Sequence, residues 1–215
     1  TITKLQSLLV FDTEISFEKI FNAQGNPLTA LGFIDTIKKA GKTSVAHNGA
    51  SSAFGRMFMR LCIENGIEVV NIVRKEQTIK ELTELGGKHF VNTSVKGWEE
   101  ELKVLCEKLD ISIIFDCCGG TQTARCLEGI KPGGTLYHFG NLELKRISDL
   151  NTHEFIFKSK KIEGWWLSKW LVSLSKEELV KYKEYIKNDF EKNDKSIEFQ
   201  MLIKENLNVN NSSYS

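Results

Sequence analysis

A run of small residues from Gly49 to Gly55 carries the clearest candidate chemistry in this sequence. It follows a short apolar run at 43–46 and opens an amphipathic segment that extends to Asn65. If that segment is a helix, its first turn presents free backbone N–H groups and the positive end of the helix dipole to an anion. A second β-branched run follows at 68–73. Strand, tight loop, helix and strand in this order form the βαβ unit that binds the phosphates of a dinucleotide.

The loop departs from the usual G-x-G-x-x-G pattern, whose glycine positions fall on Ala50, Ser52 and Gly55, with Gly49 just ahead. The third glycine, which allows the helix to pack closely on the strand, is present as Gly55. Ser52 stands where the backbone approaches the pyrophosphate, so its Cβ crowds the ligand, although its hydroxyl is able to donate to a phosphate oxygen. Two interpretations remain open: a loop that binds a dinucleotide, and a retained turn that binds nothing.

The second strand ends in Val73-Arg74-Lys75 and lacks the acidic residue that holds the ribose 2′-hydroxyl of NAD. A carboxylate at this position repels a 2′-phosphate, whereas a guanidinium binds it through two hydrogen bonds. These residues favour NADPH over NAD(H) as the cofactor, provided that the loop binds a cofactor at all. The alternative is a pair of solvated cations at a strand end.

The elements that must position these residues follow from the hydrophobic pattern. Helices are expected over 26–41, 52–65, 78–85 and 98–109, and then from Gly120 to Ile130. Strands are expected at 43–46, 68–73, 90–91, 111–115 and 135–139, while the apolar runs 155–157 and 162–166 lead to a sixth strand. A capping box at Ser175–Glu178 opens a further helix that extends to about Asp189. This alternation predicts an α/β, Rossmann-type doubly wound fold with a mostly parallel sheet of about six strands.

The composition and the residue spacing argue against several classes of function. The chain has 215 residues, is 41% hydrophobic and carries a formal net charge of +1, so we expect no nucleic-acid footprint. No apolar run reaches the ~20 residues of a membrane span. The five cysteines show no C-x-x-C pair and no zinc-type spacing, which favours free, buried thiols in a reducing compartment. The four histidines are dispersed, and no Ser-His-Asp or H-E-x-x-H arrangement appears, so we predict no catalytic residue in this chain.

Several stretches, in order, carry a family resemblance. They are the segments 26–32 (NPLTALG), 49–55, 85–89 (LGGKH), Phe115-Asp116 with Gly119-Gly120, and 131–134 (KPGG). With these motifs the chain resembles the medium-chain dehydrogenase/reductases, in particular their quinone oxidoreductase and zinc-type alcohol-dehydrogenase-like branches. The resemblance extends over about residues 8–174.

That resemblance implies a two-domain enzyme in which a Rossmann cofactor domain is inserted into a β-rich, GroES-like catalytic domain. Here the similarity begins at the linker between the domains, so we expect the catalytic domain to be absent and the cofactor domain to stand alone. The family's zinc ligands belong to the absent domain, and we therefore predict no metal. Asp116, at a strand end, is expected to be structural.

The resemblance also places Cys118, Gly140 and Asn141 near the nicotinamide half of a cofactor, although packing is an equal alternative for Cys118. Together with the loop and the strand end, the expected cofactor-binding residues are Gly49, Ala50, Ser52, Ala53, Phe54, Arg74, Lys75, Cys118, Gly140 and Asn141.

The densest aromatic patch contains Trp165, Trp166 and Trp170. It fits the interface of a homo-oligomer or larger assembly, where tryptophan is enriched, and ordinary core packing or a lining of the nicotinamide side are the alternatives. We expect a linker with a short helix at 1–25, a Rossmann domain at 26–174, a helix and strand at 175–205, and a flexible tail at 206–215.

Two functions are consistent with these observations. The first is the NADPH-binding domain of a medium-chain oxidoreductase, quinone- or enoyl-reductase-like, that is not catalytic on its own. The second is a relict dehydrogenase domain that serves as an accessory subunit of a larger, mitochondrial complex. An intracellular location follows in both cases, without separating cytoplasm from mitochondrion.

Overall fold

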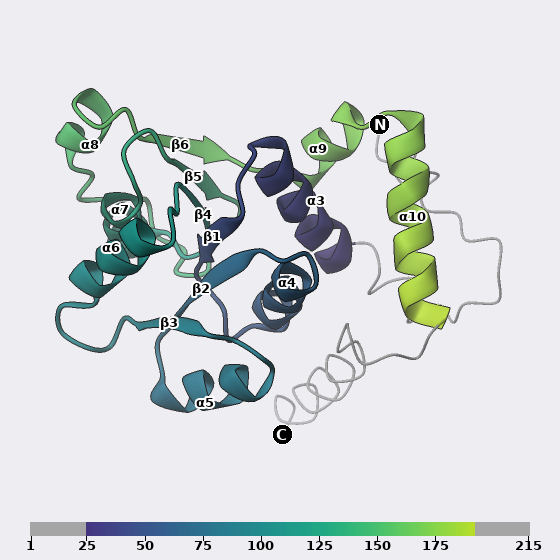
Figure 1. Cartoon of the computed structure of the whole chain (residues 1–215). Coiled ribbons are helices and arrows are strands. Elements are labelled where there is room, and N and C mark those ends of the chain that lie inside the picture. The colour runs from purple at the N-terminus through teal and green to yellow at the C-terminus, as the bar shows by residue number, and fades with distance from the viewer. Residues whose placement is uncertain (1–24, 192–215) are drawn as a thin grey trace, which may run out of the picture. The chain divides into compact units, whose positions relative to one another are not determined.

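The computed structural model describes residues 25–191, in which six strands form one sheet (Figure 1). These are β1 (Ser44–His47), β2 (Glu68–Val73), β3 (His89–Asn92), β4 (Ile113–Asp116), β5 (Thr135–His138) and β6 (Lys161–Gly164). Their spatial order is β3-β2-β1-β4-β5-β6, and every neighbouring pair is parallel. The predicted doubly wound sheet is confirmed, and among the described strands it is parallel throughout. The order reverses between β1 and β4, which is the point where such sheets bind ligands.

Helices and strands alternate along the chain, as the hydrophobic pattern predicted. They are α3 (Asn26–Lys39), α4 (Ala53–Glu64), α5 (Glu76–Glu84), α6 (Trp98–Lys108), α7 (Gly120–Gly129), α8 (Thr152–Ile156), α9 (Leu167–Ser173) and α10 (Lys176–Glu191). The predicted capping box is confirmed, because Ser175 and Glu178 exchange side-chain to backbone hydrogen bonds before α10. The expected sixth strand is present as β6, and the run 155–157 before it lies at the end of a short helix that Asn151 caps.

The sheet buries its two faces against different side chains. Ile114 and Phe115 are neighbours on β4 and therefore point to opposite faces. On one face Phe33 of α3 stacks on Phe115 with ring centroids 3.7 Å apart and lies edge-on to Phe58 of α4. On the other face, α6 and α7 complete an aliphatic cluster that includes Val70, Ile72, Leu102, Cys106, Ile114, Cys126, Leu127 and Leu136. Burial on both faces explains why the strand sequences are nearly continuous apolar runs.

The described residues belong to two compact units. One contains residues 33–166 and therefore the whole sheet, while the other combines 25–32 with 167–191. The short helix expected within 1–25, the strand expected toward the end of 175–205 and the flexible tail expected at 206–215 lie outside the described residues.

The three tryptophans of the aromatic patch, Trp165, Trp166 and Trp170, differ in burial. In the sheet unit, Trp165 lies edge-on to Phe33 and donates from Nε1 to Thr36 Oγ1 at 3.2 Å, while Trp166 is 69% exposed. In the other unit, Trp170 is buried and packs on Tyr182. A role of these tryptophans in assembly remains a prediction. Trp166 is the exposed one of the three.

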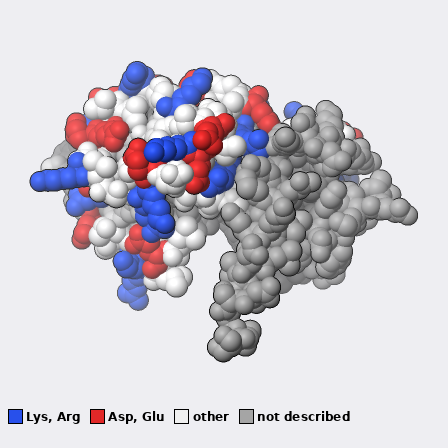
Figure 2. All heavy atoms as spheres, turned by 90° about the horizontal axis from the view of Figure 1, so that it is seen from below, with Lys and Arg blue, Asp and Glu red and all other residues white. Residues whose placement is uncertain are grey.

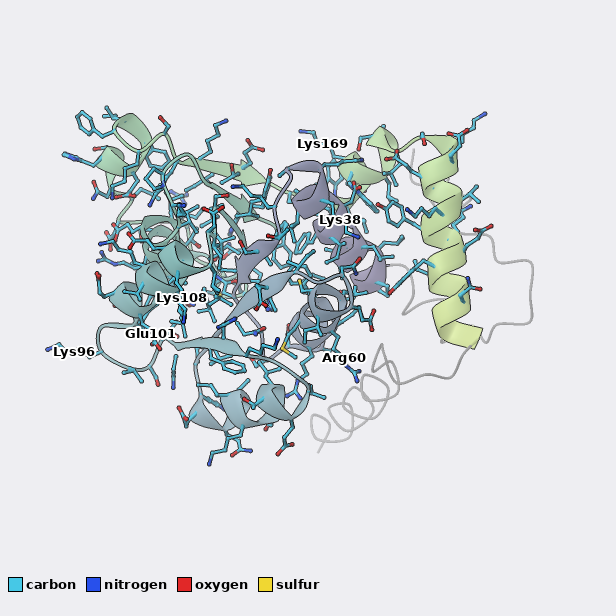
Figure 3. All side chains as sticks on the ribbon, viewed as in Figure 1. Lys38, Arg60, Lys96, Glu101, Lys108 and Lys169 are labelled. Carbon is cyan, nitrogen blue, oxygen red and sulfur yellow. The ribbon has the colours of Figure 1, made fainter. Side chains whose placement is uncertain are left out.

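The described surface mixes charges of both signs. Figure 2 shows lysine and arginine side chains interspersed with aspartate and glutamate on the face seen from below. Lys96, on the loop between β3 and α6, points away from the sheet (Figure 3). Among the described helices, none is both long and apolar enough to cross a membrane.

Candidate dinucleotide site

A cleft of about 230 Å³ opens where the carboxyl ends of β1, β2 and β4 meet. This is the point of reversal in the strand order, where an open α/β sheet leaves a crevice for a ligand. It is lined by the last residues of β2 and by residues that follow β1, β2, β4 and β5: Gly49, Ser51, Ser52, Ile72, Val73, Arg74, Cys118, Gln122, Leu142 and Glu143. The structure thus brings together four of the ten expected residues, namely Gly49, Ser52, Arg74 and Cys118.

The small-residue loop is held by contacts that only glycine permits. Gly49 has φ +67°, and a Cβ there would meet the Cys117 Sγ at 2.6 Å. A Cβ on Gly55 would lie 2.5 Å from the Gly49 carbonyl oxygen and 2.6 Å from the Ala50 Cα. Gly55 therefore performs the packing role of the third glycine in the dinucleotide pattern.

Ser52 acts as the N-cap of α4. Its Oγ accepts a hydrogen bond from the Gly55 N–H at 3.0 Å and donates to the Gly49 carbonyl at 2.7 Å. A hydroxyl has one proton to donate, so the expectation that Ser52 donates to a phosphate is wrong in this conformation. The capping role stabilises the start of the helix instead.

Backbone donors at the start of α4 remain available to an anion. The N–H groups of Ala53 and Phe54 have no hydrogen-bond acceptor among the described residues. The Phe54 side chain itself packs inward against Phe33 and Phe139. Ala53 and Phe54 were both expected at the site. The groups that they present to a ligand are their backbone N–H groups rather than their side chains.

Arg74 supplies the positive charge in the cleft. It is exposed, follows the last residue of β2, and forms no ion pair with another described residue. Lys75 is also exposed but serves as the N-cap residue of α5, outside the cleft lining. An unpaired guanidinium is free to bind a phosphate through two hydrogen bonds.

A buried polar network lies next in sequence to residues that line the cleft, since Asn48 precedes Gly49. Asp116 is fully buried, and its carboxylate accepts from Asn48 Nδ2 and from Thr123 Oγ1, the latter at 2.8 Å. His138 Nδ1 lies 2.6 Å from the same carboxylate. Asn48 in turn accepts from the Cys117 N–H at 2.8 Å. The network therefore joins the ends of β1, β4 and β5 to the start of α7.

Sequence reasoning missed His138 as a partner of Asp116. The two residues end successive parallel strands and are paired in register. Aligning the ends of the predicted strands would have placed them side by side, since parallel strands end at the same edge of the sheet.

Cys118 lines the cleft with an uncharged thiol. A hydrogen bond with Cys117 and burial together raise the pKa of the Cys118 thiol well above its usual range. The thiol therefore stays protonated, and reactivity that depends on a thiolate is suppressed. All five cysteines are free thiols.

His47 lies just before the loop and is buried rather than solvated. Its Nε2 is 2.9 Å from Asn71 Oδ1, and its ring lies edge-on to Phe58. Burial lowers the pKa of His47 from 6.5 to about 4, so the imidazole is neutral near pH 7.

The other expected residues lie beside the cleft. Ala50, within the loop, is fully buried, and Gly140 lies against Cys117, where an added Cβ would be 3.1 Å from the Cys117 Cβ. Asn141 Oδ1 accepts from the Lys145 N–H at 3.2 Å. These residues shape the loops around the cleft rather than line it.

Leu142 and Glu143 line the cleft, although the sequence did not point to them. Their N–H groups donate to the carbonyls of Cys117 and Cys118 at 2.8 and 3.0 Å, so the segment after β5 is tied to the segment after β4. The sequence around them is polar and lacks a recognisable motif, so nothing in it indicated that these residues line a cleft.

Residues 53–183 match the family model described as "Zinc-binding dehydrogenase". The chain belongs to this family, and the described sheet is the cofactor-binding Rossmann domain of a medium-chain dehydrogenase/reductase. Within residues 25–191, no group of three or more His, Cys, Asp or Glu side chains could hold a metal ion. The described residues therefore do not fit the zinc in the family's description.

The chain is similar to "Enoyl-[acyl-carrier-protein] reductase, mitochondrial" of Caenorhabditis elegans, with 33% identity over 172 residues. That alignment covers 76% of this chain and 47% of the relative. The chain spans about half the length of the curated relatives it matches.

Solved structures share the fold at lower identity. A Mesorhizobium loti protein, provisionally assigned as an NADPH:quinone reductase, has a TM-score of 0.74 and 21% identity, and the match covers 84% of this chain and 53% of that one. The mitochondrial 2-enoyl thioester reductase Etr1p/Etr2p heterodimer from Candida tropicalis has a TM-score of 0.67 and 18% identity, with coverage of 81% and 50%. A complex of Etr1p with NADP and crotonyl-CoA has a TM-score of 0.65 and 17% identity, with coverage of 86% and 52%.

Proposed function

We propose that this chain binds NADPH in the cleft at the β1–β4 reversal, as the cofactor domain of an enoyl-thioester or quinone reductase. The observation that carries the proposal is Arg74, an unpaired guanidinium at the end of β2 that lines the same cleft as the phosphate loop. In a Rossmann fold this strand end faces the adenosine ribose, where NADP carries its 2′-phosphate.

The proposed positions of the cofactor groups follow from the donors available. The N–H groups of Ala53 and Phe54, at the positive end of the α4 dipole, are placed for the pyrophosphate. Arg74 would bind the 2′-phosphate, while Cys118 and the segment after β5 would contact the nicotinamide half. When bound, NADPH supplies a hydride, and the protein's part is to hold and orient the ring.

The proposed reaction class follows from the relatives. The Caenorhabditis elegans relative is an enoyl reductase, and the Etr1p complex contains NADP and crotonyl-CoA. Reduction of an enoyl thioester is therefore the favoured activity, with quinone reduction next. Because the described chain contains the cofactor half, we expect turnover to require further residues that hold the substrate against the nicotinamide.

The test is a titration of the full chain with NADPH and with NADH, followed by quenching of tryptophan fluorescence. We expect micromolar binding of NADPH, and Arg74→Ala should weaken it by roughly tenfold to a hundredfold because a charge-assisted pair is lost. Binding of NADH should be unchanged in this variant. Lys80→Ala, which removes an exposed lysine from α5, is the matched control and should leave both affinities unchanged.

An accessory role is the second candidate, and a specific feature of the loop favours it. Ser52 places a Cβ where the pattern has glycine, and its hydroxyl is already bonded to Gly49. If neither nucleotide binds at millimolar concentration, the reductase proposal fails and the accessory role is favoured. Purification of the chain from its natural source would then be expected to yield it within a larger complex.

We also propose that the chain assembles with a partner and acts in mitochondria. The β6 edge has no neighbouring strand among the described residues beyond β5, and the exposed Trp166 follows it. The fold neighbours include a heterodimer, and the relative from Caenorhabditis elegans is described as mitochondrial. Sedimentation of Trp166→Ala against the unaltered chain tests the assembly, and import into isolated mitochondria tests the location.

A further inference from the structure

The cleft carries opposite charges at its two ends. Arg74 follows β2, in the half of a Rossmann sheet that takes the adenosine, and Glu143 follows β5, in the half that takes the nicotinamide. Among the residues that line the cleft, Glu143 is the acidic one. The cofactor is itself asymmetric, because its nicotinamide ring is a cation when oxidised and neutral when reduced.

The Glu143 side chain is partly buried beside the start of α7. Its side chain is 30% exposed, and its backbone N–H donates to the Cys118 carbonyl at 3.0 Å. A Cβ added to Gly120 would lie 2.9 Å from Glu143 Oε2, so the carboxylate sits beside the first turn of α7. The Lys145 ammonium is 3.5 Å from the same oxygen but is 70% exposed, which limits how far it neutralises the carboxylate.

The charge of Glu143 acts on the two redox states of the cofactor in different ways. It repels the phosphates of NADP⁺ and NADPH equally, so this contribution cancels when the two affinities are compared. It attracts the pyridinium ring of NADP⁺ and has no comparable attraction for the neutral dihydropyridine of NADPH. In a partly buried cleft the interaction is screened less than in water.

We propose that Glu143 is a specificity-determining residue that makes this cleft favour the oxidised, cationic nicotinamide over the reduced ring. The proposal rests on the NADPH site proposed above. Its consequence is that the oxidised product of a reductase is held more tightly than it would be in a neutral cleft.

Calorimetric titration of the full chain with NADP⁺ and NADPH tests this, with the ratio of the dissociation constants, Kd(NADP⁺)/Kd(NADPH), as the readout. Glu143→Gln keeps the shape of the side chain and removes the charge, and the ratio should rise about fivefold. Lys145→Gln removes the counter-charge of Glu143, and the ratio should fall. Glu84→Gln removes an exposed carboxylate from α5 and should leave the ratio unchanged.

The outcomes separate the two proposals. If both cofactors bind the unaltered chain and the ratio is the same in Glu143→Gln, the inference about Glu143 is overturned while the NADPH site stands. If neither cofactor binds the unaltered chain, the site itself fails, and the inference fails with it. Circular dichroism of each variant confirms that a changed affinity does not reflect unfolding.

Discussion

The two halves of the sheet bury different kinds of polar group. One half is formed by β1, β2 and β3, and the other by β4, β5 and β6. In the first half the buried polar contact is between neutral groups, His47 and Asn71, 2.9 Å apart. In the second half a buried carboxylate, Asp116, is surrounded by Asn48, Thr123 and His138. The ligand-facing charges are also opposite, with Arg74 in the first half and Glu143 in the second.

The two halves are therefore stabilised by different kinds of contact. A neutral buried pair has a modest desolvation cost and needs one partner, whereas a buried carboxylate is stable only when several donors satisfy it. The Asp116 network therefore depends on contacts among four separate elements, one of which is the end of β1, whereas the phosphate loop of the first half depends on a loop and a helix start that are continuous in sequence. Three variants or conditions test this contrast, in order of expected effect.

The largest effect is expected from Asp116→Ala, which breaks the second half. Removing the carboxylate leaves the buried Asn48 and Thr123 and the partly exposed His138 without this acceptor, and should lower the free energy of unfolding by about 3 to 5 kcal/mol. Urea denaturation measures this loss. Glu163→Ala, an exposed acidic residue on β6, is the control and should change stability by less than about 0.5 kcal/mol. Equal effects of the two substitutions would show that the Asp116 network adds no stability.

Acid should weaken the first half through His47. The unfolded chain takes up a proton on this histidine near pH 6.5, while the folded chain does so near pH 4. Stability from the neutral imidazole is thus complete above pH 6.5 and is lost as the pH falls toward 4, by up to roughly 3 kcal/mol. Denaturation midpoints measured across this window should fall more steeply for the unaltered chain than for His47→Leu, which cannot titrate. Parallel pH profiles would exclude His47 as the cause.

The smallest effect of the three is expected from Gly55→Ala, which tests the loop of the first half. The new Cβ would press on the backbone of Gly49 and Ala50, and we expect a loss of about 2 kcal/mol because backbone yields less readily than a side chain. Gly164→Ala is a matched control, since nothing lies within 4 Å of a Cβ there. Thermal unfolding of both variants measures the difference, and an unchanged Gly55→Ala would contradict the close packing of α4 on the loop.

The sequence allowed more to be predicted for the first half than for the second. Strand β2 was expected over the same residues, 68–73, and Gly55 and Arg74 belong to a single βαβ unit that the sequence pattern reveals, although the capping role of Ser52 was not predicted. The Asp116–His138 contact depends on the register of two strands, and the place of Leu142 and Glu143 depends on pairing between two loops. Such contacts are set by the tertiary fold, so periodicity and turn signals do not reveal them.

We propose that a dinucleotide lies across both halves of this cleft, and backbone amide NMR of the full chain during titration with NADPH is the decisive test. We expect the chemical-shift changes to concentrate at Ala53, Phe54 and Arg74 in the first half and at Cys118 and Glu143 in the second. With 2′,5′-ADP, which lacks the nicotinamide, only the first group should shift. Absent shifts at millimolar NADPH, or shifts confined to the separate pocket of about 120 Å³ around Gly66, Gly86 and His89, would contradict the claim.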